Sequence, residues 1–369
     1  MRVNVDLMSA NYFGSGICVF ENEIVRRLAA MPEFELHGCA SYIRAYSSKD
    51  YTRFSFPVTY SPFPYKLAYN LSWPFAYETI MGYKPDVNLF CTYCLPNFRF
   101  REPVIGTVHD IILQKVNNEP AEVTEKYDAQ VRHCIEVSDT IVTVSNATKQ
   151  DIVEYYGLNP DKIVVVHNGV DCSEYAVKLT EADKARIRKK YGLPEKFILY
   201  FGAVRKHKNL ERLLRAYAML PHRIREEYKL VLTRKENALE RLAADLEIGQ
   251  DVVFTGFVDD GDKVALYKMA EVSMFVSLYE GFGIPIIEAQ AAGTPVITSN
   301  ISSMPEAAGE GAILVDPYSV ENIAAELEHV IENSTLREQL IEKGYANAQR
   351  FSWDAAAKQM AEVVRRYRR

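Results

Sequence analysis

The stretch YEGFGIPIIEAQAAG (residues 279–293) holds two glutamates, Glu280 and Glu288, separated by a glycine-containing turn and a predicted helix start. It follows the apolar run VSMFVS, which has the composition of a buried strand. Glycine permits a tight turn in which backbone can approach a ligand. Pro285 suits the first turn of a helix, and Gly293 suits its end. The order strand, turn, helix predicts one unit of an α/β sheet.

The same stretch has an order of groups that suits a nucleotide-sugar. A helix N-terminus near Phe282–Ile287 would present backbone N–H groups to an anion such as phosphate. Glu288, about one turn into the helix, can accept two hydrogen bonds from a vicinal diol such as ribose. Glu280 precedes the turn, where a sugar attached to the phosphate would lie. The spacing alone is equally consistent with two solvated glutamates that flank a strand–helix turn.

Short β-rich runs alternate with helical patterns along the rest of the chain, which predicts parallel sheets covered by helices. Helices are expected over Val19–Met31 and over residues 146–157, the latter capped by Ser145 or Asn146. A polar, charge-rich stretch at residues 173–194 interrupts the alternation. We therefore predict two α/β halves that bind a ligand in the cleft between them, beyond the carboxyl ends of their strands. The expected strands are Val3–Leu7, Val87–Phe90, Pro103–Asp110, Thr140–Ser145, Lys162–Asp171, Phe197–Val204, Tyr228–Thr233, Asp251–Val258, Val272–Ser277 and Thr294–Ser299.

The composition of the 369 residues is that of a globular chain long enough to bury a core without disulfides. A net charge of −6 argues against a general nucleic-acid surface. The start, MRVNVDLMSA, has the pattern of a strand rather than of a signal peptide. No apolar segment approaches the roughly 20 residues that span a bilayer. Six scattered cysteines indicate a reduced chain, so we expect it in the cytoplasm or at the inner membrane surface.

Two features of the first half allow more than one interpretation. Cys91 and Cys94 form a C-x-x-C pair, but neither a second pair nor a nearby histidine completes a zinc set, so buried structural cysteines are the simpler interpretation and no metal is expected. Residues 50–100 are rich in aromatic residues and proline. This stretch is either a helical insertion that packs its rings in the core or a surface for a sugar acceptor or a membrane.

A second candidate site is FGAVRKHKNLERLLRAY (residues 201–217). Gly202 permits close backbone approach, and Arg205 and Lys208 directly precede a predicted helix, Asn209–Tyr217. Cations in this place could stabilise the charge of a departing diphosphate. Ordinary surface charge is the alternative, but cations at a helix N-terminus oppose the helix dipole.

Two further candidates rest on less specific patterns. The Gly14–Gly16 loop precedes a predicted helix, but it lacks the full G-x-G-x-x-G fingerprint because Val19 occupies the third glycine position. His109 and Asp110 end an apolar strand at the expected active edge of a sheet. His109 could bind a sugar hydroxyl or transfer a proton, or the two residues could be a packed histidine and a capping aspartate.

Taken together, these motifs resemble the retaining glycosyltransferases of family 4, which have the GT-B fold of two facing Rossmann-like domains with the active site in the cleft between them. The resemblance runs nearly the full length. It implies an N-terminal acceptor-binding domain (1–172), a linker (173–194), a C-terminal donor-binding domain (195–350) and a final helix (351–369) that packs back on the first domain. It is carried by YEGFGIPIIE with AQAAGTPVITSNISSMPEAAG, by FGAVRKHKNLERLL, TVHDI, TVSNATKQDIVEYYG and KIVVVHNGVD, and by FSWDAAAKQMAEVV.

The resemblance also implies transfer of a sugar from a nucleotide-sugar to an acceptor hydroxyl with retained anomeric configuration, without a cofactor or an obligatory metal. Glu288 would bind the donor ribose and Glu280 would lie beside the donor sugar. Lys208 and Arg205 would hold the diphosphate, and His109 would contact the transferred sugar. The expected catalytic residues are His109, Glu280, Arg205 and Lys208. The expected donor-binding residues are Gly16, Gly202, Arg205, Lys208, Phe257, Glu280, Gly281, Phe282, Gly283, Ile284 and Glu288.

The prediction is a cytosolic glycosyltransferase of surface-polysaccharide synthesis, with GDP-mannose as donor and a glycan or lipid-linked glycan as acceptor. A UDP- or ADP-sugar donor is the alternative within the enzyme class. A catalytically silent nucleotide-sugar-binding protein would be free to lose Glu280, Glu288 and Lys208, which are all present. A Rossmann oxidoreductase would need the glycine fingerprint and an acid about 20 residues further on. The terminal RRYRR is either a solvated tail or a contact for anionic lipid.

Overall fold

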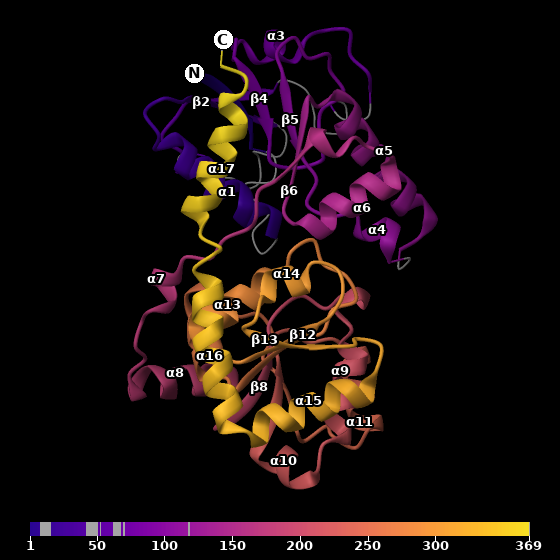
Figure 1. Cartoon of the computed structure of the whole chain (residues 1–369), viewed down its shortest axis with the longest axis vertical. Coiled ribbons are helices and arrows are strands. Elements are labelled where there is room, and N and C mark those ends of the chain that lie inside the picture. Colours follow the sequence, from indigo (N-terminus) through magenta and orange to yellow (C-terminus); the bar gives the residue numbers. More distant parts are fainter. Residues whose placement is uncertain are drawn as a thin grey trace. The chain divides into compact units, whose positions relative to one another are not determined.

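The computed structural model describes residues 1–7, 16–41, 51, 53–61, 68, 71–116 and 119–368. These form two compact units (Figure 1). Unit 1 comprises Met1–Gly169 and Trp353–Arg369, and unit 2 comprises Val170–Ser352. Each unit contains one parallel sheet with helices packed around it, as the alternation of strand and helix patterns predicted.

The sheet of unit 1 has seven strands in the order β3-β2-β1-β4-β5-β6-β7, and all neighbours run parallel. The chain order reverses between β1 and β4, which is the switch point of a doubly wound sheet. Strands β4, β5 and β6 are buried along their whole length, as expected for a parallel sheet covered on both faces. The strands are β1 (Arg2–Asp6), β2 (Glu35–Ser41), β3 (Val58–Ser61), β4 (Val87–Phe90), β5 (Val104–Thr107), β6 (Thr140–Thr143) and β7 (Ile163–Val165).

The first and the last helix of the chain both belong to unit 1. The last helix packs along the first, where the rings of Phe20 and Trp353 meet edge to face at 6.3 Å and the guanidinium of Arg27 donates to Asp354 at 2.5 Å. Ser145 caps α6, since its hydroxyl accepts from the backbone N–H of Thr148. The helices are α1 (Gly16–Ala29), α3 (Tyr77–Met81), α4 (Ile112–Lys115), α5 (Ala121–Val137), α6 (Asn146–Tyr156), the 3₁₀ turn η2 (Pro160–Lys162) and α17 (Trp353–Arg365).

The aromatic stretch in residues 50–100 is not a helical insertion in its described part. This part includes the edge strand β3, the short helix α3 and the central strand β4. Proline, which is disfavoured in a helix interior, recurs along the stretch. The expectation that its rings pack in the core is confirmed, because Tyr77, Phe90 and Phe98 are buried in one hydrophobic cluster.

The sheet of unit 2 has six parallel strands in the order β10-β9-β8-β11-β12-β13. The sequence prediction ended at β12 and missed the edge strand β13. Only the last residue of β13 is buried, so its pattern lacks the continuous apolar run of the central strands. The strands are β8 (Lys196–Tyr200), β9 (Tyr228–Leu232), β10 (Val252–Phe254), β11 (Val272–Phe275), β12 (Val296–Ser299) and β13 (Ala312–Val315).

Helices surround this second sheet, and residues 173–194 form part of unit 2. Within that segment, Thr180 and Asp183 make a reciprocal capping box at the start of α8. Among the described residues, no helix is both long and apolar enough to cross a membrane. The helices are α7 (Cys172–Tyr175), α8 (Glu181–Tyr191), η3 (Lys206–Lys208), α9 (Leu210–Met219), α10 (His222–Glu227), α11 (Asn237–Asp245), α12 (Asp260–Met269), α13 (Ile284–Ala292), α14 (Met304–Ala308), α15 (Val320–Glu332) and α16 (Ser334–Ala348).

Candidate functional site

The glycine turn between β11 and α13 is formed as the sequence predicted. Gly283 is the residue before the helix and has a φ of 104°, a conformation that favours glycine. It has no side chain that could cap α13, so the first backbone N–H groups of the helix lack a cap from this residue. Two hydroxyls hold the turn in place: Ser303 donates to the carbonyls of Glu280 and Phe282, both at 2.9 Å, and Ser302 also donates to Glu280.

Lys208 and Glu280 form a direct ion pair at the carboxyl ends of two neighbouring strands. The Lys208 ammonium lies 2.6 Å from a Glu280 carboxylate oxygen, and the two side chains are only 16% and 12% exposed. The ammonium also lies 5.1 Å from the centre of the Phe275 ring. Because β8 and β11 are adjacent and parallel, the segments that follow them meet at one edge of the sheet. The sequence placed both residues in one site, and the structure brings them together.

Asn209 helps to hold the segment that follows β8 against the segment that follows β11. It adopts a left-handed conformation with a φ of 62° between η3 and α9. Its buried amide donates to the carbonyls of Val276 at 3.0 Å and of Pro317 at 2.7 Å. In addition, the backbone N–H of Leu278 donates to the His207 carbonyl at 2.7 Å. The Lys208 segment is therefore fixed by its own backbone and amide contacts to the loops after β11 and β13.

Glu288 is nearly buried inside α13 and has two partners on α12. Lys263 donates to Glu288 Oε1 at 2.5 Å, and the Tyr267 hydroxyl donates to Oε2 at 3.1 Å. Burial alone would lower the pKa of Lys263, but the attraction of Glu288 outweighs burial and leaves this pKa raised. Lys263 and Tyr267 thus hold the Glu288 carboxyl group in one orientation.

The remaining predicted residues of unit 2 lie on loops after the strands. Gly202 follows β8, and its N–H donates to the Thr233 hydroxyl at 3.1 Å. Arg205 is exposed at the start of η3 and makes no ion pair with the described residues. Phe257 follows β10 and is 61% exposed, with the Arg234 guanidinium 4.7 Å from its ring centre. The structure joins none of these three directly to Glu280 or Glu288.

His109 lies in unit 1, just after β5, and is buried. Its Nε2 contacts the Cys91 carbonyl at 2.8 Å, and since a carbonyl only accepts, Nε2 carries the proton and Nδ1 is left as an acceptor. Burial lowers the pKa of His109 to about 4 despite this hydrogen bond, so the ring is neutral at pH 7. It is suited to accept a hydrogen bond from a hydroxyl rather than to supply a proton.

The other unit 1 candidates have simpler roles. Asp110 accepts from the backbone N–H of Ile112 at 3.1 Å beside the start of α4, and its carbonyl accepts from the Tyr127 hydroxyl. Gly16 is the first residue of α1, while Gly14 lies outside the described residues. Asp110 thus accepts from the first backbone N–H of α4, although Ile111 occupies the cap position of this helix.

Sequence reasoning missed Ser302, Ser303, Asn209, Lys263 and Tyr267, which hold the predicted residues in place. The two serines follow β12 in the run SNISSMP, where a polar turn next to a predicted active edge was the available signal. Lys263 and Tyr267 lie on one face of α12 with helical spacing, and nothing in that spacing identifies Glu288 as their partner.

Comparison with known proteins identifies the family. The family models for glycosyl transferases group 1 and for Glycosyltransferase Family 4 match residues 183–347 and 22–174. The O-antigen chain mannosyltransferase B of Escherichia coli is 30% identical over 268 residues, which cover 70% of either chain. The chain is a family 4 glycosyltransferase.

Two further similarities agree with this membership. The serotype-specific mannosyltransferase WbdA of Escherichia coli is 32% identical over 225 residues, which are 59% of this glycosyltransferase but only 28% of WbdA. A sucrose-phosphate synthase of Thermosynechococcus elongatus has a TM-score of 0.78 at 18% identity, with 99% of this chain and 98% of that chain covered. The two parallel-sheet units and this structural similarity confirm the predicted GT-B fold. Lys208, Glu280 and Glu288 fall within the matched group 1 range, His109 falls within the family 4 range, and Gly16 lies outside both.

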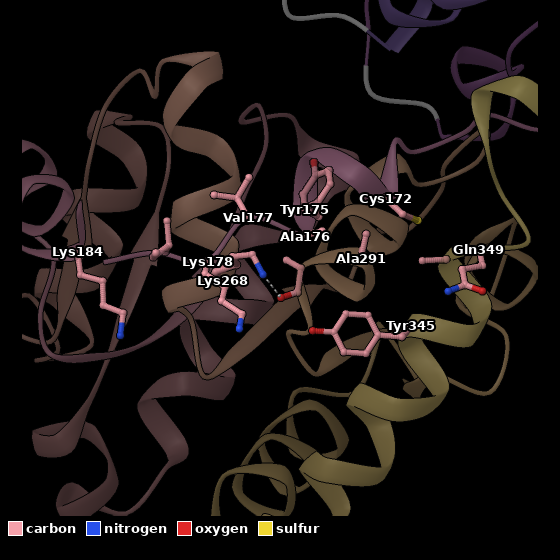
Figure 2. Close-up of a pocket in the computed structure, with 13 residues that line it drawn as sticks. Cys172, Tyr175, Ala176, Val177, Lys178, Lys184, Lys268, Ala291, Tyr345 and Gln349 are labelled. Carbon is pink, nitrogen blue, oxygen red and sulfur yellow. Dashed lines mark hydrogen bonds between the residues drawn. The ribbon is translucent and has the colours of Figure 1, made fainter. Parts of the chain in front are cut away.

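Unit 2 of the glycosyltransferase also contains a cavity of about 730 Å³ that none of the predicted site residues lines (Figure 2). Its charged lining residues are three lysines, Lys178, Lys184 and Lys268. Lys268 donates weakly, at 3.5 Å, to the Ala292 carbonyl at the end of α13.

Proposed function

We propose that this glycosyltransferase moves a hexose, mannose from GDP-mannose, to a hydroxyl of a lipid-linked or growing surface glycan. The observation that carries the proposal is the arrangement within unit 2 of a paired Lys208 and Glu280, an α13 N-terminus without a side-chain cap, and a buried Glu288. The named relatives support mannose as the sugar, since both are mannosyltransferases. A UDP- or ADP-sugar would use the same three features, so the nucleotide is the part that most needs a test.

Each part of the site would serve one part of the donor. The Glu288 carboxylate would accept from the ribose diol. The N-terminus of α13 and Lys208 would hold the diphosphate and stabilise the charge that develops on it as the sugar leaves. Glu280 lies on the other side of the glycine turn from Glu288, where it would contact the sugar. Arg205 is exposed and free of ion pairs with described residues, so it can turn toward the phosphates.

The reaction proposed retains the anomeric configuration and uses no metal. Lys208 supplies a fixed positive charge in place of a divalent cation. The departing phosphate would take the proton of the acceptor hydroxyl as the new glycosidic bond forms on the face that the phosphate leaves. The neutral imidazole of His109 would accept from a sugar hydroxyl through Nδ1, which its low pKa keeps unprotonated at pH 7.

A thermal-shift comparison tests the donor assignment. GDP, UDP, ADP and their sugars are added separately at equal concentration, and a ligand present at 100 times its Kd stabilises by about 2.7 kcal/mol. The proposal expects the largest rise in Tm with GDP and GDP-mannose, and turnover that persists in EDTA. A larger shift with UDP or ADP would move the assignment to that nucleotide, and no shift with any of them would overturn the proposed function.

A further inference from the structure

The lysine-lined cavity of unit 2 carries charge of one sign only. Lys178, Lys184 and Lys268 line it, and no aspartate or glutamate is among the described lining residues. The three lysines come from separate elements, namely the loop before α8, α8 itself and α12. A hollow lined by charges of one sign concentrates its electric field and attracts counter-ions. Because the whole chain has a net charge of −6, the general charge of the protein does not explain this basic hollow.

Two of these lysines lack a carboxylate partner within the described part of the chain. Lys184 pairs with Glu181 at 2.7 Å, whereas Lys178 and Lys268 form no ion pair there. Lys268 instead has a long contact of 3.5 Å with the Ala292 carbonyl. Burial lowers the pKa of Lys268, and no neighbouring carboxylate offsets this effect. An anionic ligand in the cavity would supply the missing partner.

The basic groups favour a phosphate over a carboxylate. The guanidinium fork of arginine suits a planar carboxylate best, and no arginine is among the described lining residues. Lysine binds phosphate as a compact point charge. Several lysines from separate elements therefore suit a phosphate group, which has more than one negative charge and presents its oxygens in several directions.

The remaining lining suits an uncharged body with hydroxyl groups. The cavity volume of about 730 Å³ lies in the range of small-molecule sites, about 300–1,000 Å³. Ala291, Ala292 and the ring of Tyr175 provide apolar wall, while Tyr345 and Gln349 carry a hydroxyl and an amide at the end of α16. Figure 2 shows the Tyr345 hydroxyl pointing from α16 toward the side of the cavity where the lysines lie. A hydroxyl and an amide can both donate to and accept from sugar hydroxyls.

We propose that this cavity is a second ligand site of the glycosyltransferase and that it binds a phosphorylated sugar. Lys268 and Lys178 contact the phosphate, and Tyr345 and Gln349 hydrogen-bond to the sugar hydroxyls. No residue assigned to the donor is among the lining residues that the structure describes, so the site is separate from the proposed donor site. The second site does not depend on the proposed function.

Calorimetry with mannose 1-phosphate and with inorganic phosphate, at constant ionic strength, tests the second site. The wild type should bind mannose 1-phosphate more tightly, because only this probe has sugar hydroxyls. Lys268→Met removes a charge-assisted hydrogen bond to the phosphate and should weaken mannose 1-phosphate about tenfold. Ala176→Trp, at an exposed position on the cavity wall, should also weaken it because the indole fills the cavity without removing a charge.

Two further lysine variants are the controls. Lys189 is an exposed lysine of α8 outside the described lining, so Lys189→Met should bind both probes as the wild type does. Lys208→Met removes the cation of the proposed donor site and should leave the affinity for mannose 1-phosphate unchanged. Because Ala176 and Lys189 are both exposed, their variants keep the comparison informative even if Lys268→Met impairs folding.

Three results would overturn the second site. The first is that the wild type binds neither probe, or binds both equally. The second is that Lys208→Met loses mannose 1-phosphate while Lys268→Met and Ala176→Trp retain it, which would place the ligand at the proposed donor site. The third is equal weakening by Lys189→Met and Lys268→Met, which would indicate general charge attraction alone. Nucleotide binding is measured separately by the thermal-shift comparison, so failure of the second site leaves the proposed function intact.

Discussion

Replacing Lys208 with methionine removes the cation that pairs with Glu280 but keeps a side chain of similar length. The charged atoms lie 2.6 Å apart, and the side chains are 16% and 12% exposed. Removal of one partner from a fully buried pair costs about 3–5 kcal/mol. Here the remaining exposure lets water reach the Glu280 carboxylate, which reduces the expected loss of unfolding free energy to about 2 kcal/mol. For a domain of roughly 150–250 residues this lowers Tm by about 4–8 °C.

The double variant Lys208→Met/Glu280→Gln separates stability from chemistry. It has no unpaired buried charge, so most of the lost stability should return. Turnover should stay about 10²- to 10³-fold below wild type, because the charge that stabilises the departing phosphate and the carboxylate proposed to contact the sugar are both missing. Stability is measured by urea unfolding of all four proteins, and turnover by release of the nucleotide from the donor. Lys206→Met, an exposed lysine on the same short helix η3, is the control and should match the wild type in both assays.

Two results would refute this account of the pair. An unchanged unfolding free energy in Lys208→Met would show that the contact contributes nothing to the fold. Recovery of turnover together with stability in the double variant would show that neither the Lys208 charge nor the Glu280 carboxylate acts on the donor.

Three further changes test other parts of the structure. Asn209→Gly keeps the left-handed backbone but loses two buried hydrogen bonds, so urea unfolding should show a loss of about 2–3 kcal/mol; a loss below 0.5 kcal/mol would contradict the role of its amide. The pKa of His109 is 6.5 in the unfolded chain and about 4 in the folded one, so between these values only the unfolded state binds the proton and the free energy of unfolding decreases as the pH is lowered. His109→Gln should lessen this decrease between pH 7 and pH 5 by about 2 kcal/mol. Parallel pH profiles of unfolding for the two proteins would argue against the low pKa. Gly293→Ala places a methyl group 2.1 Å from the Tyr345 hydroxyl at a φ of 78°. The exposed Tyr345 side chain can move away, so the backbone conformation should account for most of a cost of about 1–2 kcal/mol. Tyr345→Ala should therefore recover little of the loss, and a neutral Gly293→Ala would contradict the backbone argument.

The sequence was sufficient where a local pattern determines the structure. The bounds of α13 follow from Pro285 and Gly293, and the central strands follow from continuous apolar runs. The pairing of Lys208 with Glu280 could be expected because both residues follow parallel strands, whose carboxyl ends share an edge. Strands β2, β3 and β13 lie at or next to the sheet edges and were not predicted. The edge strand β13 is largely unburied, and a helical insertion was predicted in residues 50–100 although proline recurs there.

Contacts between distant helices could not be predicted. Lys263 and Glu288 are 25 residues apart on separate helices, and only the packing of α12 on α13 makes them partners. In the same way, the position of Tyr175 depends on how α7 packs on α13 within unit 2, whereas the sequence predicted a linker at residues 173–194. Local patterns therefore located the chemical groups, while tertiary packing determined which groups hold them in place.

The central claim is that Glu280, Lys208 and Glu288 contact successive parts of one donor. It is tested most directly by calorimetric affinities of GDP-mannose, GDP and GMP for Glu280→Gln, Lys208→Met and Glu288→Gln. We predict that Glu288→Gln weakens all three ligands, that Lys208→Met weakens GDP-mannose and GDP much more than GMP, and that Glu280→Gln weakens GDP-mannose alone. Equal effects of the three variants on GMP, or an unaltered affinity of Glu288→Gln for all three ligands, would contradict it.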